Sequence, residues 1–476
     1  MTKKLSNSLS KQQRIIIGCR AVGGENISKI AEEFETNRVF IYSQKGKTLK
    51  TIEEHFDKEK QSIPTILMND NQVNKIILSC AVECKGSIRD IKEHFHNVFN
   101  YDISEGKISG ILNTAADKAR EFNRNVNLSS IKIGAHDEIF QAGMPVLVGV
   151  DPYSTFVYLM EASKKRDGIS WSMAIYDKYL NQKLELEESV TDGGLGMKKG
   201  IKEVFPAINE QGDIFHAEMK LTNGLNIYER KAYGAINNEY ESATKLLKSS
   251  DKKKKKATEN YEKALVETPK SINLYDTVNI LIMWVRELFE IGGYTYNDRI
   301  GLLDFVIDEL NKLTNGNQQL EAAVKNISLN KENLLMFVRK AETEMKFICD
   351  RENINTNIFY LLWKQRFYSE SSTKYWEIEN SIIKIAGQNI KVIRPLFDEL
   401  VRKLVRASSI VECINSLIRP YLFLKRTLKG KFLDLLQFYF NTRKYMNSRV
   451  DERKGKSPFE LLTGKEFGSW LEMLGY

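Results

Sequence analysis

Residues 184–196 read LELEESVTDGGLG, and this stretch decides the fold class. Its apolar residues alternate with polar ones, which is the period of a strand with one buried face: they are Leu184, Leu186 and Val190. Asp192 has the same parity, so its carboxylate continues a buried face and needs hydrogen bonds or a metal there. The two glycines that follow end the strand and let a ligand or another backbone approach. An ordinary Asp-Gly-Gly turn is the simpler interpretation of these residues alone.

A second strand bearing an acid precedes this stretch. Every other residue of 131–139 is apolar, except that Asp137 takes one of the places. The apolar run 145–150 predicts a strand buried on both faces, and 155–162 a third strand. Helical spacing over 170–180 and 197–205 and a short strand over 213–217 complete the order β-β-β-α-β-α-β. This order predicts a mixed α/β sheet with crossover helices.

Length and composition limit the classes of protein. A chain of 476 residues is too long for one ordinary domain, and about three are expected. The net charge of +9, from 71 basic and 62 acidic residues, is compatible with a polyanionic partner but does not identify one. The five cysteines form no close metal-type cluster and fit a reducing compartment. Polar first residues and the lack of a long apolar run lead us to expect a cytoplasmic protein with no membrane partner.

Two tandem patterns predict helix-turn-helix DNA-binding units over residues 1–60 and 66–128. In the first, a helix from Ile27 to Phe34 and a turn precede a third helix over 38–45. That helix carries groups suited to the major groove: Arg38, Tyr42, Gln44 and Lys45. In the second unit, Ser104 opens a helix with Lys107 and Asn113 facing outward. Small helical bundles with solvated polar faces are the alternative for both units.

Residues 219–404 show helical periodicity in place of the strand period, which predicts an all-helical insertion domain. Lys252–Lys256 form a run of five lysines inside it. Such a run is usually a solvated helix end or loop, although it can contact phosphates.

A helix near residue 412 carries a third acid. Val411, Ile414 and Ile418 form its apolar stripe, and another face presents three polar residues at i, i+3 and i+7: Glu412, Asn415 and Arg419. Glu412 also has a purely local alternative role, because Ser409-x-x-Glu412 is a capping box. A basic tail follows this helix.

Taken in order, these motifs resemble the DDE transposases of bacterial insertion sequences, relatives of the retroviral integrases. Four matches carry the resemblance: His136-Asp137-Glu138 with the strand that Asp151-Pro152-Tyr153-Ser154 closes, Thr191-Asp192-Gly193-Gly194, Glu412 with Asn415 and Arg419, and the tail from Phe440-Asn441 to Lys456-Ser457-Pro458-Phe459-Glu460. The resemblance implies an RNase H-like catalytic core over 130–218, which residues 405–476 complete. The 220 residues between Asp192 and Glu412 (412 minus 192) depart from the compact members and are similar to the helical insertion of the hAT group.

The resemblance also implies the chemistry. Asp137 would be the bridging ligand of two metal ions, with Asp192 and Glu412 as the flanking ligands. Oxygen ligands favour Mg²⁺ or Mn²⁺. The implied activity is cleavage of double-stranded DNA at the inverted-repeat ends of an element and strand transfer into target DNA, by in-line phosphoryl displacement. A homo-oligomer on DNA, a dimer, in the bacterial cytoplasm is expected, with Asn415 and Arg419 contacting DNA.

Several alternatives stay open at this point. An RNase H-like nuclease or resolvase without strand transfer would share the three acids, and a domesticated, inactive copy would keep only DNA binding. Asp151 also ends an apolar strand, but it precedes Pro152 in a turn, where it has a sufficient local role. We therefore assign the first acid to Asp137, which lies within a strand. His216 lies near the end of the last predicted strand and is expected to be structural.

Overall fold

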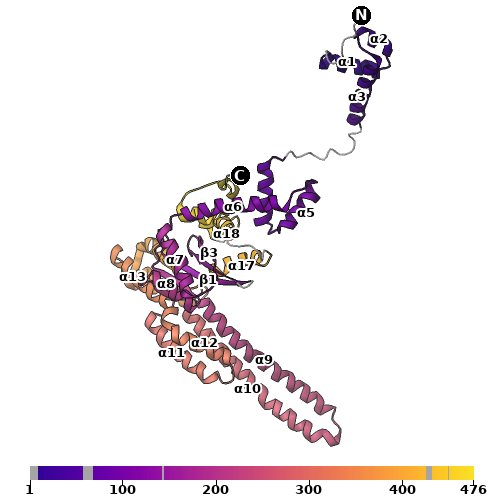
Figure 1. Ribbon diagram of the computed structural model, residues 1–476. Helices are drawn as coiled ribbons and strands as arrows, with labels where there is room; N and C mark the ends of the chain where they lie inside the picture. Colours follow the sequence, from indigo (N-terminus) through magenta and orange to yellow (C-terminus); the bar gives the residue numbers. More distant parts are fainter. Residues whose placement is uncertain (1–8, 57–67, 142–143, 425–430, 449) are drawn as a thin grey trace. The chain divides into compact units, whose positions relative to one another are not determined.

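The structure is a computed structural model, and it describes residues 9–56, 68–141, 144–424, 431–448 and 450–476. The chain divides into two compact units, residues 1–71 and 72–476. It is a mixed α/β protein with N-terminal helices, a five-stranded mixed sheet and a large all-helical region (Figure 1). In the described residues, no helix is both long enough and apolar enough to cross a membrane.

The first unit is a three-helix arrangement with its own small core. Its helices are α1 (Lys11–Val22), α2 (Ile27–Glu33) and α3 (Arg38–Phe56). Asn26 caps α2 through its side chain, and Glu35 takes a left-handed conformation in the turn before α3. Ile17, Ile30 and Ile41 contribute one buried side chain from each helix. Three helices are present where the first helix-turn-helix pattern was predicted, but the third helix continues through Gly46 to Phe56 and does not end at residue 45.

A second set of three helices opens the larger unit: α4 (Asp70–Val82), α5 (Ile88–Phe99) and α6 (Glu105–Asn125). Ser87 and Ser104 cap α5 and α6. The last helix packs lengthwise on α18 (Lys431–Thr442), where Arg120 pairs with Asp434 at 2.8 Å. These helices therefore belong to the same compact unit as the sheet.

The sheet has the strand order β3-β2-β1-β4-β5. Its strands are β1 (Ile133–Gln141), β2 (Met144–Val150), β3 (Val157–Ala162), β4 (Glu188–Thr191) and β5 (Asn209–Gly212). β2 is antiparallel to both of its neighbours, β1 and β3, whereas β4 and β5 run parallel to β1. Helices α7 (Gly168–Gln182) and α8 (Leu195–Val204) supply Trp171 and Ile201 to the core on one face. α17 (Ser409–Leu424) packs against β1 and β2.

The predicted order β-β-β-α-β-α-β is confirmed, with one correction at its last strand. The fifth strand lies at 209–212, and the segment expected to be a strand, 213–217, is the start of a helix. The side chain of Asp213 caps that helix by accepting from the backbone N–H of His216. From Ile214 onward the buried residues recur every three or four positions, so the helical period has already begun there.

The helical region begins with a long hairpin of α9 (Ile214–Leu247) and α10 (Asp251–Phe289), which extends away from the sheet (Figure 1). Six more helices and a 3₁₀ turn complete the region: α11 (Tyr296–Leu313), α12 (Gln318–Leu334), α13 (Met336–Glu352), α14 (Thr356–Gln365), α15 (Thr373–Ala386), η3 (Gly387–Asn389) and α16 (Ile390–Arg402). They share one large apolar core. The C-terminal segment adds η4 (Asp451–Arg453), α19 (Pro458–Thr463) and α20 (Trp470–Met473).

The chain leaves and re-enters the sheet region at a single point. The backbone N–H of Ile214, the first residue of α9, donates to the carbonyl of Arg406 at 3.2 Å. Two residues further on, the N–H of Ser408 donates to the carboxylate of Asp213 at 3.2 Å. The helices between residues 214 and 402 therefore leave the sheet region and return beside the point of departure. The chain then continues directly into α17.

Candidate active site

Two of the predicted acids meet at one edge of the sheet because their strands are neighbours. β1 and β4 are parallel, and their pairing ends at His136 opposite Thr191. Asp137 follows His136 and Asp192 follows Thr191, so the two aspartates occupy matching positions on neighbouring strands. Neighbouring strands lie about 4.8 Å apart, which brings these two carboxylates to the same place.

Asp137 is buried and hydrogen-bonded. One carboxylate oxygen accepts from the backbone N–H of Glu138 at 2.7 Å, and the other accepts from Nδ2 of Asn415 at 2.6 Å. Burial raises the pKa of Asp137 to about 7 against the effect of the Glu138 N–H, and the negative charges of Glu412 and Asp192 add to the rise. The three acids are therefore close enough to repel one another.

Glu412 reaches this place from α17. Val411, Ile414 and Ile418 are buried as predicted, and this stripe fixes α17 on the sheet. The Asn415 contact with Asp137 then sets the rotation of the helix, and Glu412, three residues earlier, faces the same side. Oε1 of Glu412 lies 3.2 Å from Nε2 of His216.

His216 links Glu412 to a buried carboxylate. Its Nδ1 lies 2.9 Å from Oδ2 of Asp213, which also accepts from the N–H and hydroxyl of Ser408. The hydrogen bond to Asp213 raises the pKa of His216 against burial, and the charges of Asp192 and Glu412 raise it further. Burial would raise the pKa of Asp213, but the hydrogen bonds from His216 and Ser408 outweigh it and hold that pKa below its usual value.

Sequence reasoning missed Asp213 and underestimated His216. The signal that could have found them is the spacing Asp213-x-x-His216 at a helix start, where the aspartate both caps the helix and fixes the imidazole. The capping-box alternative for Glu412 does not describe this structure. α17 begins at Ser409, Ser408 precedes it, and the Glu412 carboxylate pairs with His216.

The side chain of Asp151 has different hydrogen-bond partners from the three acids. It is buried in the turn after β2, where its side chain accepts from the N–H and hydroxyl of Ser154 and from the N–H of Tyr153. Burial raises the pKa of Asp151, and the charge that opposes the rise is that of Arg453. These contacts are those of an Asx turn, the local role expected from the sequence.

The residues predicted to bind DNA have different surroundings. Arg38 and Tyr42 of the first unit and Lys107, Asn113 and Arg419 of the second are exposed, whereas Gln44 and Lys45 are half-buried on α3. Asn415 is 0% exposed and bonds to Asp137, so the expectation that it contacts DNA is corrected: its environment is that of a positioning residue.

The donor set suits a hard cation, although the side chains are engaged with other partners. Carboxylate oxygens are the ligands that Mg²⁺ and Mn²⁺ prefer, and Oδ1 of Asn415 is buried beside Asp137 with no hydrogen-bond partner among the described residues. Across the ranges that the structure describes, no three histidine, cysteine, aspartate or glutamate side chains are arranged to hold a metal ion as they stand.

The site is thus defined by the chain's own geometry: two aspartates in register on parallel strands, a glutamate on a helix that returns from the far end of the sequence, and an Asp-His pair behind that glutamate. The repulsion between the three carboxylates marks a place where positive charge is favoured. No protein-family model matches this chain, and no curated protein matches it either.

Proposed function

We propose that this protein is a DDE-type transposase, which cleaves DNA at the ends of an element and joins the strands to a target by phosphoryl transfer. The observation that carries the proposal is the meeting of Asp137, Asp192 and Glu412 at one edge of the sheet, across 275 positions of sequence (412 minus 137). The strand order β3-β2-β1-β4-β5, with antiparallel then parallel pairing, supports an RNase H-like core.

The return of the chain beside its point of departure also supports the proposal. Glu412 belongs to the site only if residues 219–404 are inserted into the sheet domain, and the hydrogen bond between Ile214 and Arg406 supports such an insertion. A freely attached C-terminal domain would not need this closure.

The protein's own groups have distinct parts in such a site. Asp137, Asp192 and Glu412 would hold Mg²⁺ or Mn²⁺, which when bound activates water or a DNA 3′-hydroxyl and stabilises the leaving oxygen. Asn415 orients the Asp137 carboxylate through its 2.6 Å hydrogen bond. His216, fixed by Asp213, positions Glu412 at 3.2 Å. Exposed Arg419, two turns beyond Glu412, is placed to contact DNA phosphates.

The N-terminal helices would supply recognition of the DNA. The first unit presents Arg38 and Tyr42 on the exposed side of α3, the third helix of a helix-turn-helix. Pairing two element ends calls for two copies of the chain, so we propose that the active form is a dimer on DNA.

The test is a cleavage and joining assay with the full chain. The DNA is a plasmid in which the sequences that flank this reading frame border a marker, with Mg²⁺, Mn²⁺ or EDTA. We expect metal-dependent nicks at the element ends and joined products, both lost in Asp137→Asn, Asp192→Asn and Glu412→Gln and kept in Asp151→Asn.

Each other result has a definite meaning. Cleavage without joined products would favour a nuclease or resolvase. Specific binding of the flanking DNA without any cleavage would favour an inactive, DNA-binding copy. Loss of cleavage in Asp151→Asn with activity retained in Asp137→Asn would move the site to Asp151.

A further inference from the structure

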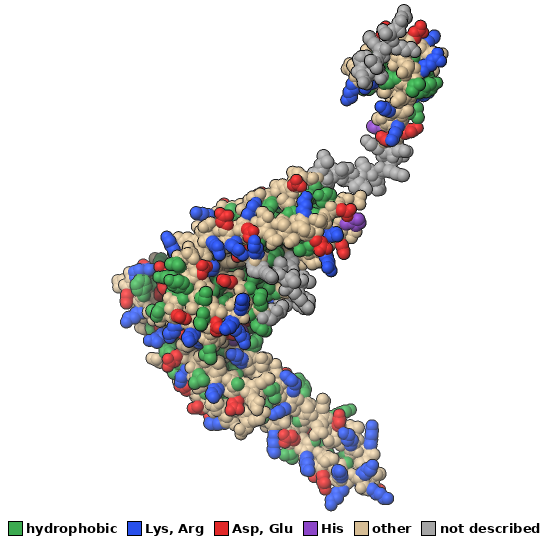
Figure 2. All heavy atoms as spheres, viewed as in Figure 1, with side chains coloured by type: hydrophobic (Ala, Val, Ile, Leu, Met, Phe, Trp, Pro, Cys, Tyr) green, Lys and Arg blue, Asp and Glu red, His purple; other side chains and the backbone are tan. Residues whose placement is uncertain are grey.

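The free end of the α9–α10 hairpin carries the strongest concentration of positive charge in the sequence. Residues 245–256 hold seven lysines and one aspartate, a formal charge of +6 (seven minus one) in a chain whose formal net charge is +9. Figure 2 shows these basic side chains gathered at the end of the arm. We call residues 245–256 the hairpin tip.

The charges of the hairpin tip are almost unneutralised. Lys245 pairs with Glu241 at 3.1 Å. In the part of the chain that the structure describes, no carboxylate lies within ion-pair distance of Lys248 or of Lys252–Lys256, and all six are exposed. Asp251 and Glu259 stand four residues before and after Lys255, but neither lies within ion-pair distance of it, so the tip keeps most of its positive charge for an external partner.

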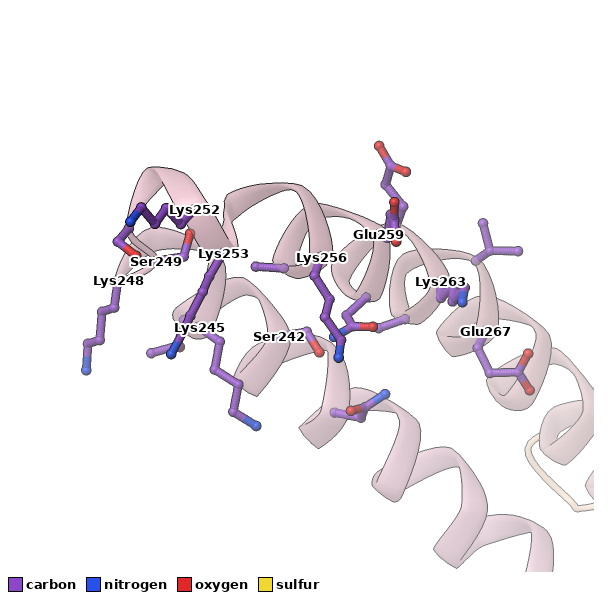
Figure 3. Close-up of a pocket in the computed structure, with 18 residues that line it drawn as sticks. Ser242, Lys245, Lys248, Ser249, Lys252, Lys253, Lys256, Glu259, Lys263 and Glu267 are labelled. Carbon is purple, nitrogen blue, oxygen red and sulfur yellow. The ribbon is translucent and has the colours of Figure 1, made fainter.

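The lysines also share a direction. Five of the seven tip lysines border an open hollow of about 1630 Å³ between the two helices, which Lys263 and three glutamates also line. In Figure 3, Lys245, Lys248, Lys253 and Lys256 extend toward one side of the hairpin, whereas Glu259 points to the opposite side. The result is a cationic face rather than an evenly charged rod.

The apolar core of the helical region does not account for the length of the α9–α10 hairpin. On α9 and α10 the large helical core ends at Tyr228 and resumes at Val278. Beyond those residues two helices pack on each other alone, through small buried side chains: Ala232, Ser242, Ala264 and Thr268. From His216 to Lys248 the helix rises about 48 Å at about 1.5 Å per residue, so the hairpin tip is remote from the three acids.

We infer that the hairpin tip binds the phosphate backbone of duplex DNA, independently of base sequence, at a distance from the cleavage site. The inference rests on the proposed function, because the same DNA that enters the site would extend past the arm. A polymer is the fitting partner: about 48 Å corresponds to about 14 base pairs at about 3.4 Å each, a span that a small anion does not bridge. Lysine, as a point charge, suits phosphate contact without base readout.

The experiment compares three full-length proteins on a random 40-base-pair duplex between 50 and 200 mM salt. The tip variant is Lys252→Gln/Lys253→Gln/Lys256→Gln, and the matched control is Lys325→Gln/Lys384→Gln/Lys391→Gln, three exposed lysines elsewhere in the helical region. Glutamine keeps the helix propensity of lysine, and circular dichroism checks the fold. Each lost phosphate contact lowers the salt slope by about 0.9, so over this fourfold range the native protein should lose about 40-fold more affinity than the tip variant.

The outcomes separate this inference from the proposed function. An unchanged salt slope in the tip variant, or an equal fall in the control, overturns the inference and leaves an acidic protein surface as the partner to seek. Metal-dependent cleavage with an unchanged slope would sink the inference alone. A lowered slope in a protein that never cleaves DNA would support the inference and count against the transposase.

Discussion

Replacement of Asp137 by asparagine should stabilise the metal-free protein while it removes activity. Burial and neighbouring charges raise the pKa of this carboxyl from 3.8 to about 7. The ionised form is therefore disfavoured in the folded protein by up to about 4 kcal/mol, at about 1.4 kcal/mol per pH unit. The side chain is 7% exposed, so little of this is screened by solvent.

The sign of the pH dependence follows from the two states. The unfolded chain releases this proton near pH 4, whereas the folded chain keeps it up to about pH 7, so stability falls as the pH rises through that window. Between pH 5 and 7 the native protein should lose up to about 2.7 kcal/mol relative to Asp137→Asn. The new amide should fit at this position. Oδ1 of Asn415 has no hydrogen-bond partner among the described residues, so it can accept an N–H of the new amide once the Asn415 side-chain amide flips.

The assay is urea unfolding in EDTA at pH 5, 6 and 7, followed by the fluorescence of the tryptophans, of which Trp171 is buried near β1. Asp213→Asn is the control, since hydrogen bonds from His216 and Ser408 hold the pKa of that carboxyl below its usual value against burial, so this variant should lose stability instead. Mg²⁺ should then raise the midpoint of the native protein and not that of Asp137→Asn. Parallel pH profiles of the native protein and Asp137→Asn would refute the reasoning.

Two further predictions concern packing. Asn441→Ala should lower the free energy of unfolding by about 1–3 kcal/mol, because the side chain of this buried residue accepts from the N–H of Val157 at 2.7 Å; an unchanged urea midpoint would contradict this. Gly200→Ala should destabilise the α7–α8 crossing by about 1–3 kcal/mol, since the new Cβ would lie 2.5 Å from the carbonyl oxygen of Gly168. Gly234→Ala is the matched control. No atom lies within 4 Å of its new Cβ, so it should stabilise α9 by about 0.5–1 kcal/mol. Melting-temperature shifts of the same sign in both glycine variants would count against the described packing.

The sequence predicted those parts of the fold in which one buried face repeats with a regular period. Ile131, Ile133 and Ile139 are buried with Asp137, as their alternation required. The fifth strand was misplaced because residues 209–212, Asn-Glu-Gln-Gly, carry no apolar alternation. They form a strand only because β4 and the helices α12 and α13 pack against them, which is a tertiary effect that local pattern does not contain.

The acids of the candidate site could be predicted from the sequence, but the side chains that hold them in place could not. Acids at strand ends and on a helix face stand out in sequence because each interrupts an apolar pattern. The contacts that hold them do not, since Asn415 meets Asp137 across 278 positions and His216 meets Glu412 across 196 (412 minus 216). Both pairings follow from how α17 lies on β1, which only the assembled core determines.

The return of the chain at Arg406, beside Ile214, has a consequence for the timing of biosynthesis. Ribosomes add about 5–20 residues per second, so roughly 10–45 s separate the appearance of Asp192 from that of Glu412, 220 residues later (412 minus 192). Throughout that interval the nascent sheet holds two acids without the third, and α17 has not yet arrived to cover β1. If the protein acts as proposed, the three acids can meet only after the whole helical region has been translated, so a half-made chain would lack a complete site.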